Sequence, residues 1–394
     1  MIENRLFSAR PLLLVAAAVI AAYAAVLAGL LMAHHGLGSW PQSGVDFAAI
    51  WAGGYQALHG GAASAYGASA LADIQSATVG TLEGYEPFAY PPHFLLAAIP
   101  LGALPYVPAF LIWQALTLAL FAGAIWLIVP RWEAAILAVA FPAVFWNVID
   151  GQNALLFGAL LGGALALLDR RPVIAGILFG LLTFRPQLGL LVPLVLMATG
   201  RWRVFASAAA TTLGLVAVSL LLFGYQAWAA FIAFLPEQFS LVLLDSQASD
   251  NWTKLQSVYS LVRRLGGGQA LAWNIHYAVS VLAASIVVWV WTRQFRFELK
   301  AAALLVGAAA VNPYFFFYDL TVLAVAAAFL MSDALKHGFI RLERPAIGLV
   351  AVGSFVFTWH AQPAGPVMYL LFAAIIAARI RLRGPAGTPA AAYA

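Results

Sequence analysis

The chain has 394 residues, of which 64% are hydrophobic and only 9% are charged. Soluble domains carry about 25% charged residues, so this composition excludes a water-exposed surface over most of the chain. The net charge of +5 does not indicate nucleic acid as a partner, because basic residues in such a chain usually mark the cytoplasmic leaflet. Cysteine is absent, which excludes disulfides and thiol chemistry. The composition therefore predicts an all-α integral membrane protein.

The apolar segments predict a polytopic bundle of about twelve transmembrane helices, each of about 20 residues or somewhat fewer. The predicted spans are 11–33, 106–129, 133–149, 153–168, 172–184, 186–200, 203–223, 273–292, 299–313, 316–333, 345–359 and 363–380. Segment 93–104 is apolar but too short to cross, so we expect it to be re-entrant or interfacial. Residues 1–383 would form a single polytopic membrane domain, and 384–394 a disordered cytoplasmic tail.

The basic residues predict the orientation of these helices. With a cytoplasmic N-terminus, every Lys and Arg lies on the cytoplasmic side except Arg185, Lys254, Arg263 and Arg264. Both termini would then be cytoplasmic, and the two long loops, 34–92 and 224–272, would be extracytoplasmic. The short polar clusters between the spans fall on the same outer side. Because loops on a rigid scaffold usually carry function, we expect the active face to be extracytoplasmic.

Asp46 precedes a predicted amphipathic helix over residues 47–58 in the first outer loop. Aspartate is a preferred N-cap, so its carboxylate could simply bind the first backbone amides of that helix. Alternatively, the carboxylate could lie at the mouth of a cavity and remove a proton from an acceptor hydroxyl. The residue types and their spacing leave both roles open.

Arg185 lies on a turn between two segments that are too short to cross the membrane fully. At a rise of 1.5 Å per residue, the twelve residues 173–184 reach only about 18 Å, so the turn should lie below the outer surface in a polar, outward-open cavity. A recessed arginine normally has an anionic partner, and its planar fork matches phosphate oxygens; the alternative is a side chain that snorkels to the headgroups. Gln187 would share this site. Lys254, Arg263 and Arg264 would meet the same phosphate or anionic lipid headgroups.

Further polar residues fall on the predicted outer side and are candidates to line the cavity. They are Tyr90, His93, Gln152, Asn153, Tyr318 and Asp319. Tyr90 and His93 could instead be ordinary interfacial residues, and Asp319 could be the N-cap of a helix over 320–331. The histidines are scattered and no metal-binding motif occurs, so no metal site is predicted.

Several short motifs occur in a fixed order along the chain. They are Asp46-Phe47 followed by Trp51 and Tyr55, Tyr90-Pro91-Pro92, Gly151-Gln152-Asn153, Arg185-Pro186-Gln187, and Pro313-Tyr314 with Tyr318-Asp319. In this order and on this predicted face, the motifs resemble those of glycosyltransferase family 87, a family of polyprenyl-phosphate-dependent membrane enzymes of the GT-C superfamily. The resemblance covers nearly the whole chain. It implies a GT-C-type helical bundle whose first outer loop carries amphipathic helices.

The resemblance also implies a function. The chain would be an inverting glycosyltransferase that takes a sugar, mannose first, from a polyprenyl-phosphate donor and transfers it to a lipid or glycan acceptor. The reaction would take place at the outer face of a bacterial plasma (inner) membrane, among membrane lipids and with no cofactor. Asp46 would correspond to the catalytic base, and Arg185 to a residue near the donor phosphate. The segment 314–319 departs from that of the family's mannosyltransferases, so no histidine role carries over.

The sequence is also compatible with two other functions. A secondary transporter would also have about twelve helices, although no repeat between the halves is evident. An oligosaccharide polymerase or ligase would use similar lipid-linked donors.

Overall fold

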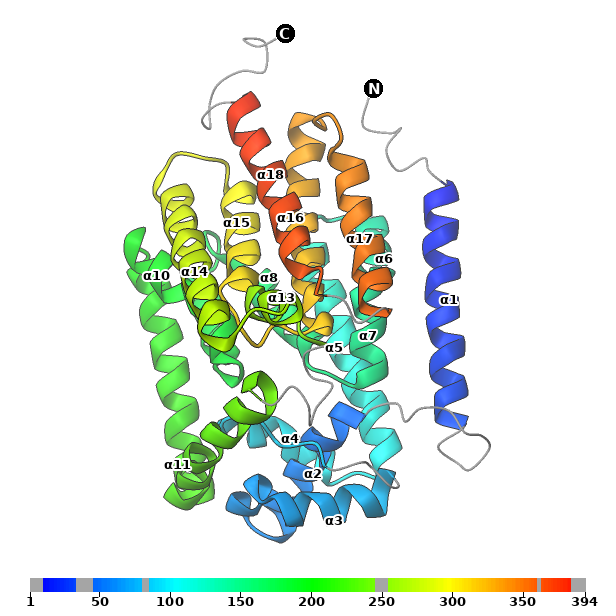
Figure 1. Ribbon diagram of the computed structural model, residues 1–394, viewed down its shortest axis with the longest axis vertical. Helices are drawn as coiled ribbons and strands as arrows, with labels where there is room; N and C mark the ends of the chain where they lie inside the picture. Colours follow the sequence, from blue (N-terminus) through cyan, green and yellow to red (C-terminus); the bar gives the residue numbers. More distant parts are fainter. Residues whose placement is uncertain (1–9, 33–44, 80–84, 245–253, 360–362, 384–394) are drawn as a thin grey trace.

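The computed structural model describes residues 10–32, 45–79, 85–244, 254–359 and 363–383, which form a bundle of helices (Figure 1). The helices are α1 Arg10–Met32, α2 Val45–His59, α3 Ala68–Val79, α4 Leu95–Gly102, α5 Tyr106–Ile128, α6 Trp132–Val139, α7 Pro142–Asp150, α8 Ala154–Leu167, α9 Pro172–Leu181, α10 Leu191–Ala198, α11 Trp202–Phe239, α13 Val258–Arg264, α14 Gln269–Thr292, α15 Phe297–Ala310, α16 Thr321–His337, α17 Glu343–Trp359 and α18 Gly365–Arg383. Short 3-10 turns join several of them: η3 Ala62–Tyr66, η4 Pro92–Phe94, η5 Leu182–Phe184, η6 Pro186–Leu188 and η8 Phe317–Leu320. The all-α prediction is confirmed for these ranges, in which the only bridge is an isolated one between Leu255 and Phe316.

Five helices of the described ranges are long and apolar enough to cross a membrane. They are Tyr106–Ile128, Trp202–Leu244, Gln269–Thr292, Phe317–His337 and Gly365–Leu382. The helices α6 and α7 make a sixth if this pair, bent by 59°, is a single span. Shorter apolar helices lie at 13–29, 92–102, 154–167 and 172–184. The chain is therefore a membrane protein, whereas the number of about twelve crossings stays a prediction.

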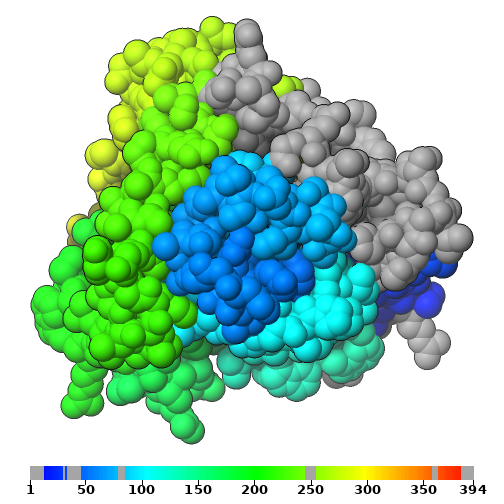
Figure 2. Space-filling view, turned by 90° about the horizontal axis from the view of Figure 1, so that it is seen from below, coloured from blue at the N-terminus to red at the C-terminus, as the bar shows by residue number. Residues whose placement is uncertain are grey.

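The helices of the first predicted outer loop and the predicted re-entrant or interfacial segment gather at one end of the molecule. Figure 1 shows α2, α3 and α4 at the end opposite to the start of α1 and the finish of α18. Seen from that end in Figure 2, the blue residues of α2 and α3 lie at the centre, beside the green later part of α11. The predicted tail 384–394, and parts of both predicted outer loops, lie outside the described residues.

Helix α2 confirms the predicted helix, but it is more deeply packed than an interfacial helix would be. Phe47, Ile50 and Trp51 are buried, and the Trp51 indole donates a hydrogen bond of 2.9 Å to the carbonyl of Leu104. A Cβ at Gly54 would lie only 2.1 Å from the Ala98 carbonyl oxygen, so α2 and α4 cross with their backbones in contact. Helix α2 is thus fixed between α4 and α5 as part of the core.

Helix α11 supports the bundle on another flank. Gly176 and Gly180 of α9 bring that helix against α11, since Cβ atoms there would meet Ser207 and Thr211 at 2.5 and 2.6 Å. Close contact through small residues is the usual way in which membrane helices pack. At Gly224, whose φ is 73°, α11 breaks its helical course before continuing to Phe239.

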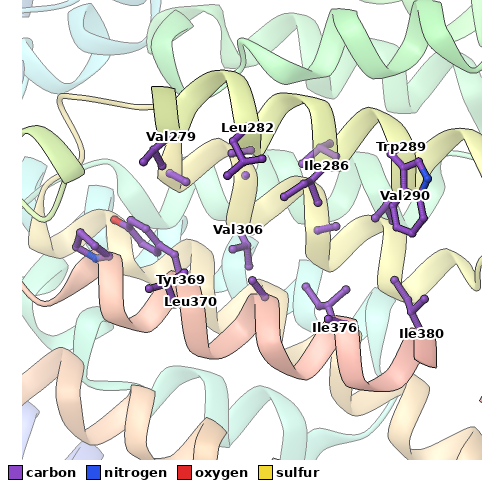
Figure 3. A pocket seen from close by; sticks show the side chains of 18 of the residues that line it. Val279, Leu282, Ile286, Trp289, Val290, Val306, Tyr369, Leu370, Ile376 and Ile380 are labelled. Carbon is purple, nitrogen blue, oxygen red and sulfur yellow. The ribbon is translucent and has the colours of Figure 1, made fainter. Parts of the chain in front are cut away.

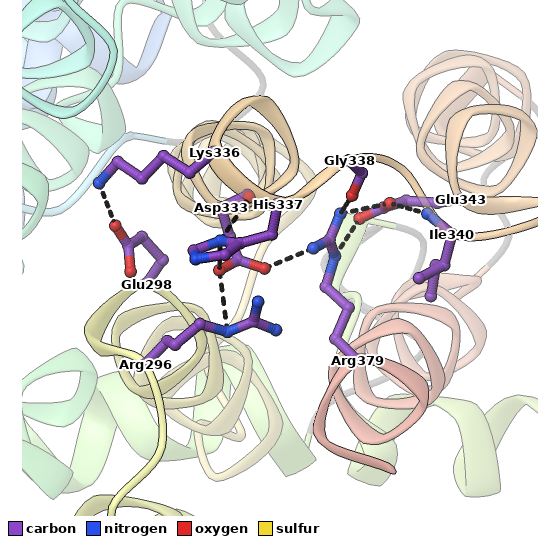
Figure 4. Close-up of polar contacts among 9 residues, drawn as sticks. All are labelled: Arg296, Glu298, Asp333, Lys336, His337, Gly338, Ile340, Glu343 and Arg379. Carbon is purple, nitrogen blue, oxygen red and sulfur yellow. Dashed lines mark hydrogen bonds and ion pairs between the residues drawn. The ribbon is translucent and has the colours of Figure 1, made fainter. Parts of the chain in front are cut away.

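A buried ionic cluster ties α15, α16, α17 and α18 together at the end where α18 finishes (Figure 4). Arg379 is fully buried; its Nε and Nη2 donate to the two carboxylate oxygens of Glu343 at 2.6 Å, and its Nη1 pairs with Asp333. Arg296 reaches the same aspartate at 3.1 Å. Buried charges need such mutual pairing, because an isolated one is very costly in an apolar interior.

Candidate active site

Asp46 lies within the first turn of α2, since the helix begins at Val45. The expectation that it stands immediately before the helix, as an N-cap would, is therefore corrected by the structure. Its half-buried carboxylate is held by another side chain: the Gln152 amide donates to Oδ2 at 2.7 Å. This contact joins the predicted base to the Gly151-Gln152-Asn153 motif.

Gly151 makes this contact geometrically feasible. It ends α7 in the left-handed conformation, with φ of 76°, which glycine adopts without strain. A Cβ at Gly151 would lie 2.5 Å from the Cβ of Phe47, so the turn lies directly against the first turn of α2. The next residue, Gln152, consequently faces Asp46.

Tyr90 continues this group of hydrogen bonds. Its hydroxyl donates to Gln152 Oε1 at 3.4 Å, and its own carbonyl accepts a bond of 2.9 Å from Tyr66. Burial raises the pKa of Tyr90 above its ordinary value, so its hydroxyl keeps its proton and remains a donor. The predicted site residues Asp46, Gln152 and Tyr90 are thus in one hydrogen-bonded chain.

Arg185 occupies the turn between η5 and η6 and is only 6% exposed. Its guanidinium makes a bidentate pair with the Asp319 carboxylate, with hydrogen bonds of 2.5 Å from Nη1 and 3.2 Å from Nη2. The Nη1 group also donates to Asn153 Oδ1 at 3.3 Å. The ring of Tyr318 lies 5.7 Å from the guanidinium carbon. The arginine therefore points into the protein and not outward to a headgroup layer, and its anionic partner here is a carboxylate.

Asp319 has a different local role from the predicted one. It lies in η8, and its Oδ2 accepts the backbone N–H of Phe316 at 3.0 Å, on the N-terminal side of the residue. It does not cap the helix that follows, so that interpretation is corrected. Instead, Asp319 is fully buried and orients the Arg185 fork.

Two acidic residues, Glu86 and Asp150, interact with Asp46, and one lysine, Lys254, interacts with both of them. Glu86 is half-buried, and burial, together with the negative charge of Asp46, raises its pKa to about 7 against the opposing effect of Lys254. Asp150 interacts electrostatically with Asp46, Glu86 and Lys254. The Oδ2 atom of Asp150 is buried, with no hydrogen-bond partner among the described residues. Lys254 thus lies with carboxylates.

Glu86 was not among the candidate site residues predicted from the sequence. Glu86 lies in the extended stretch before Tyr90. The Gln75 side-chain amide donates a hydrogen bond of 2.7 Å to the Glu86 carbonyl, and the Glu86 backbone N–H donates one of 2.8 Å to the Gln75 Oε1. Nothing in the local pattern predicts that this stretch folds back onto α2.

The remaining predicted site residues are His93, Gln187, Arg263 and Arg264. His93 is buried and its Nε2 lies 3.4 Å from the hydroxyl of Thr183, while Gln187 is half-buried in η6. Arg263 and Arg264 occupy the last turn of α13, where Arg264 is exposed. No group of three or more His, Asp or Glu side chains suited to a metal ion occurs in the ranges that the structure describes.

An apolar groove of about 480 Å³ runs between α14, α15 and α18 (Figure 3). Figure 3 shows Leu282 and Ile286 of α14 facing Ile376 of α18 across it. At one end lies Tyr369, whose hydroxyl donates to the Gln256 carbonyl at 2.8 Å and which interacts electrostatically with Asp319. The Tyr369 ring also packs edge-to-face against Phe315 at 5.7 Å between centroids, so this end of the groove lies beside the stretch that carries Asp319.

These features define a polytopic membrane protein that combines a half-buried carboxylate, a buried arginine and an apolar groove. Such a combination is suited to moving a polar group between lipid-linked molecules. The sequence profile of glycosyltransferase family 87 matches residues 88–313, more than half of the chain. The chain therefore belongs to glycosyltransferase family 87 and is a membrane glycosyltransferase. The secondary-transporter alternative finds no support in this family.

The matched range contains Tyr90, Gln152, Asn153 and Arg185 but neither Asp46 nor Asp319. The structure joins both of these to matched residues by hydrogen bonds. Comparison with curated proteins gives no match, and comparison with solved structures gives none.

Proposed function

We propose that this protein is an inverting glycosyltransferase whose donor is a polyprenyl-phosphate-linked sugar, with mannose as the sugar. The acceptor is a lipid or glycan at the outer face of a bacterial plasma membrane, and both termini are cytoplasmic. The observation that carries the proposal is the Asp46 carboxylate held by Gln152 beside the buried Arg185 group. Family membership supports the reaction class.

Asp46 acts as the general base. Its carboxylate accepts the proton of an acceptor hydroxyl, and the hydroxyl oxygen forms a bond to the anomeric carbon of the donor sugar. The bond from that carbon to the phosphate oxygen breaks, and its electron pair leaves with the polyprenyl phosphate. Because Gln152 holds Oδ2, the other oxygen of Asp46 remains for the acceptor.

Arg185 stabilises the leaving phosphate. A guanidinium has five N–H donors, and the bonds to Asp319 and Asn153 use three of them. The remaining donors are available to phosphate oxygens, and Asp319 keeps the fork in a fixed orientation. A preorganised cation of this kind stabilises the negative charge that develops on the leaving group without protonating it.

The apolar groove between α14, α15 and α18 receives the polyprenyl tail. Its walls are apolar side chains of three helices, and at one end the Tyr369 ring packs against Phe315, four residues before Asp319. A chain lying in the groove would therefore bring its phosphate towards Arg185.

The test uses the purified full chain with synthetic polyprenyl-phosphate-mannose and a panel of lipid and glycan acceptors. We expect release of polyprenyl phosphate, and a product whose anomeric configuration is opposite to that of the donor. A product with retained configuration would overturn the single-displacement mechanism. If neither this donor nor others with different sugars released polyprenyl phosphate, the donor class would be wrong.

A further inference from the structure

A second pocket lies at the opposite end of the molecule from α2 and α4, and the reaction proposed above does not use it. It has a volume of about 430 Å³ and is lined by Ala198, Thr199, Arg201, Trp291, Thr292 and Lys300. It forms where α10 ends, α11 begins, and α14 connects to α15 (Figure 1). This is the end at which α18 finishes, predicted to face the cytoplasm.

Two cations share this pocket. Arg201 pairs with Asp169 at 2.5 Å, and its guanidinium lies 6.0 Å from the ring of Trp291. The Trp291 indole donates a bond of 2.8 Å to the carbonyl of Lys300, which fixes the first turn of α15 beside the arginine. The charges of Lys300 and Arg201 repel each other. Counting Asp169, the group carries a net charge of +1.

The neutral polar groups of the pocket are already engaged. The Thr199 hydroxyl donates to the carbonyl of Val195 at 2.7 Å, and the Thr292 hydroxyl donates to that of Val288 at 2.9 Å. Their protons are thus used within the helices. The groups of the pocket that are available to bind a ligand are therefore mainly the charged ones. An anion is the ligand that relieves the repulsion between Arg201 and Lys300.

The surface around the pocket is apolar and partly aromatic. Met197 is 45% exposed, Trp202 is 59% exposed and Trp289 is 46% exposed. Exposed tryptophans next to basic residues are typical of the boundary between lipid tails and headgroups. A ligand with a charged head and apolar chains would satisfy both the pocket and this rim.

We propose that this pocket binds the phosphodiester headgroup of an anionic phospholipid, with its acyl chains lying along the exposed side chains of α10 and α14. A phosphodiester carries a single negative charge, which balances the net charge of the pocket. Arg201 offers the donors that Asp169 leaves free, and Lys300 adds a point charge. This lipid is distinct from the sugar donor, whose proposed phosphate site lies at Arg185.

The experiment measures phosphatidylglycerol binding to the detergent-purified full chain by native mass spectrometry. Lys300→Gln removes one charge and keeps the pair between Arg201 and Asp169. We expect it to weaken binding about fivefold, the effect of a single basic residue near an anionic headgroup. Arg203→Gln is the matched control, because Arg203 is an exposed neighbour outside the pocket, and it should leave this binding unchanged. Arg201→Gln should weaken binding at least as much as Lys300→Gln.

Two further ligands test the chemistry. Diacylglycerol with the same acyl chains lacks the phosphate and should bind much more weakly; equal binding would overturn recognition of the headgroup. Inorganic phosphate supplies the anion without the chains; protection of the fold against heat by phosphate as strong as that by the lipid would overturn the lipid assignment. Equal loss of phosphatidylglycerol in Lys300→Gln and Arg203→Gln would show that the pocket is not the site.

Discussion

The carboxylate of Asp46 can be tested separately as a base and as a structural group. In Asp46→Asn the side chain keeps an oxygen that can accept from Gln152, so we expect the protein to fold and to bind its donor normally. It loses the basicity of the carboxylate, and loss of a general base typically lowers the rate by about 10²–10⁴-fold. The measurement is single-turnover release of polyprenyl phosphate together with the thermal unfolding midpoint.

The matched control is Asp73→Asn, which changes an exposed aspartate of α3 in the same predicted outer region. It should have wild-type turnover. Near-normal turnover in Asp46→Asn would mean that Asp46 is not the base, and Glu86 and Asp150 would become the next candidates.

The charges of Arg185 and Asp319 should compensate each other in the free energy of unfolding, whereas turnover should depend on Arg185 itself. Arg185→Gln leaves a buried carboxylate without its cation, which costs about 3–5 kcal/mol of stability in other buried pairs. The double variant Arg185→Gln with Asp319→Asn removes both charges and should recover most of the free energy of unfolding. Donor turnover should stay low in both, because the phosphate has lost its cation.

This comparison requires unfolding curves and turnover at saturating donor for the single and double variants. Full activity in the double variant would show that Arg185 serves only to neutralise Asp319.

Glu86 should give the protein a pH-dependent stability. Its pKa is raised from 4.5 to about 7 in the folded state, chiefly by burial. Between these values the folded state holds a proton that the unfolded chain has lost, so the free energy of unfolding falls as the pH rises. Below about pH 4.5 Glu86 is protonated in both the folded and the unfolded state, so it adds no pH dependence to the free energy of unfolding. Above about pH 7 it is ionised in both states, and the stability that its proton contributed is fully lost.

Glu86→Gln should therefore flatten the decline in the unfolding midpoint between pH 5 and pH 7 and be more stable than the wild type at pH 8. An unchanged slope in Glu86→Gln would show that another group titrates in this range.

The sequence indicated most members of the site but not how they pair. Asp46, Gln152, Arg185 and Asp319 were all candidates, because polar residues at the ends of apolar segments stand out. Arg185 and Asp319 are 134 positions apart, so no local rule could join them. The same holds for Glu86, whose position depends on the fold of the stretch before Tyr90.

At the scale of elements, the turn between α7 and α8 controls the distance from Gln152 to Asp46. Gly151→Ala would place a methyl group against Phe47 and force a left-handed conformation, which costs about 1–3 kcal/mol for a residue with a side chain. We expect lower stability and a clear loss of turnover, since α2 must move away from the turn. Thermal unfolding and single-turnover rates measure the two effects.

Gly189→Ala is the matched control, because a Cβ there would make only an ordinary contact, 3.6 Å from the Pro186 carbonyl oxygen. It should have little effect on either quantity. If Gly151→Ala were equally harmless, the close approach to α2 would not matter for the reaction.

Helix positions were the most predictable elements, because long apolar runs have few alternatives. The predicted span 106–129 corresponds to α5, and the predicted helix 47–58 to α2. Burial of α2 was not predictable in the same way. Its contact with α4 depends on Gly54 and on a carbonyl of another segment, which no periodicity reveals.

At the scale of the whole molecule, the orientation predicted from basic residues can be tested in this cysteine-free chain. Ser69 of α3 and Gln294, between α14 and α15, are both exposed and lie at opposite ends of the bundle (Figure 1). A cysteine at Ser69 should react with an impermeant maleimide in intact cells, and one at Gln294 only after permeabilisation. The reverse pattern would invert the proposed topology and place the site in the cytoplasm.

The shortness of α9 and α10 has a consequence for the surrounding bilayer. The two helices have 10 and 8 residues, so they rise only about 15 and 12 Å, while the hydrocarbon core is about 30 Å thick. Both expose apolar side chains, among them Ile174 and Leu194. Lipids next to so short an apolar face must compress or tilt to avoid exposing their tails. We therefore expect the outer leaflet to dip beside the Arg185 turn, so that a headgroup diffusing in that leaflet descends towards the arginine without leaving the membrane.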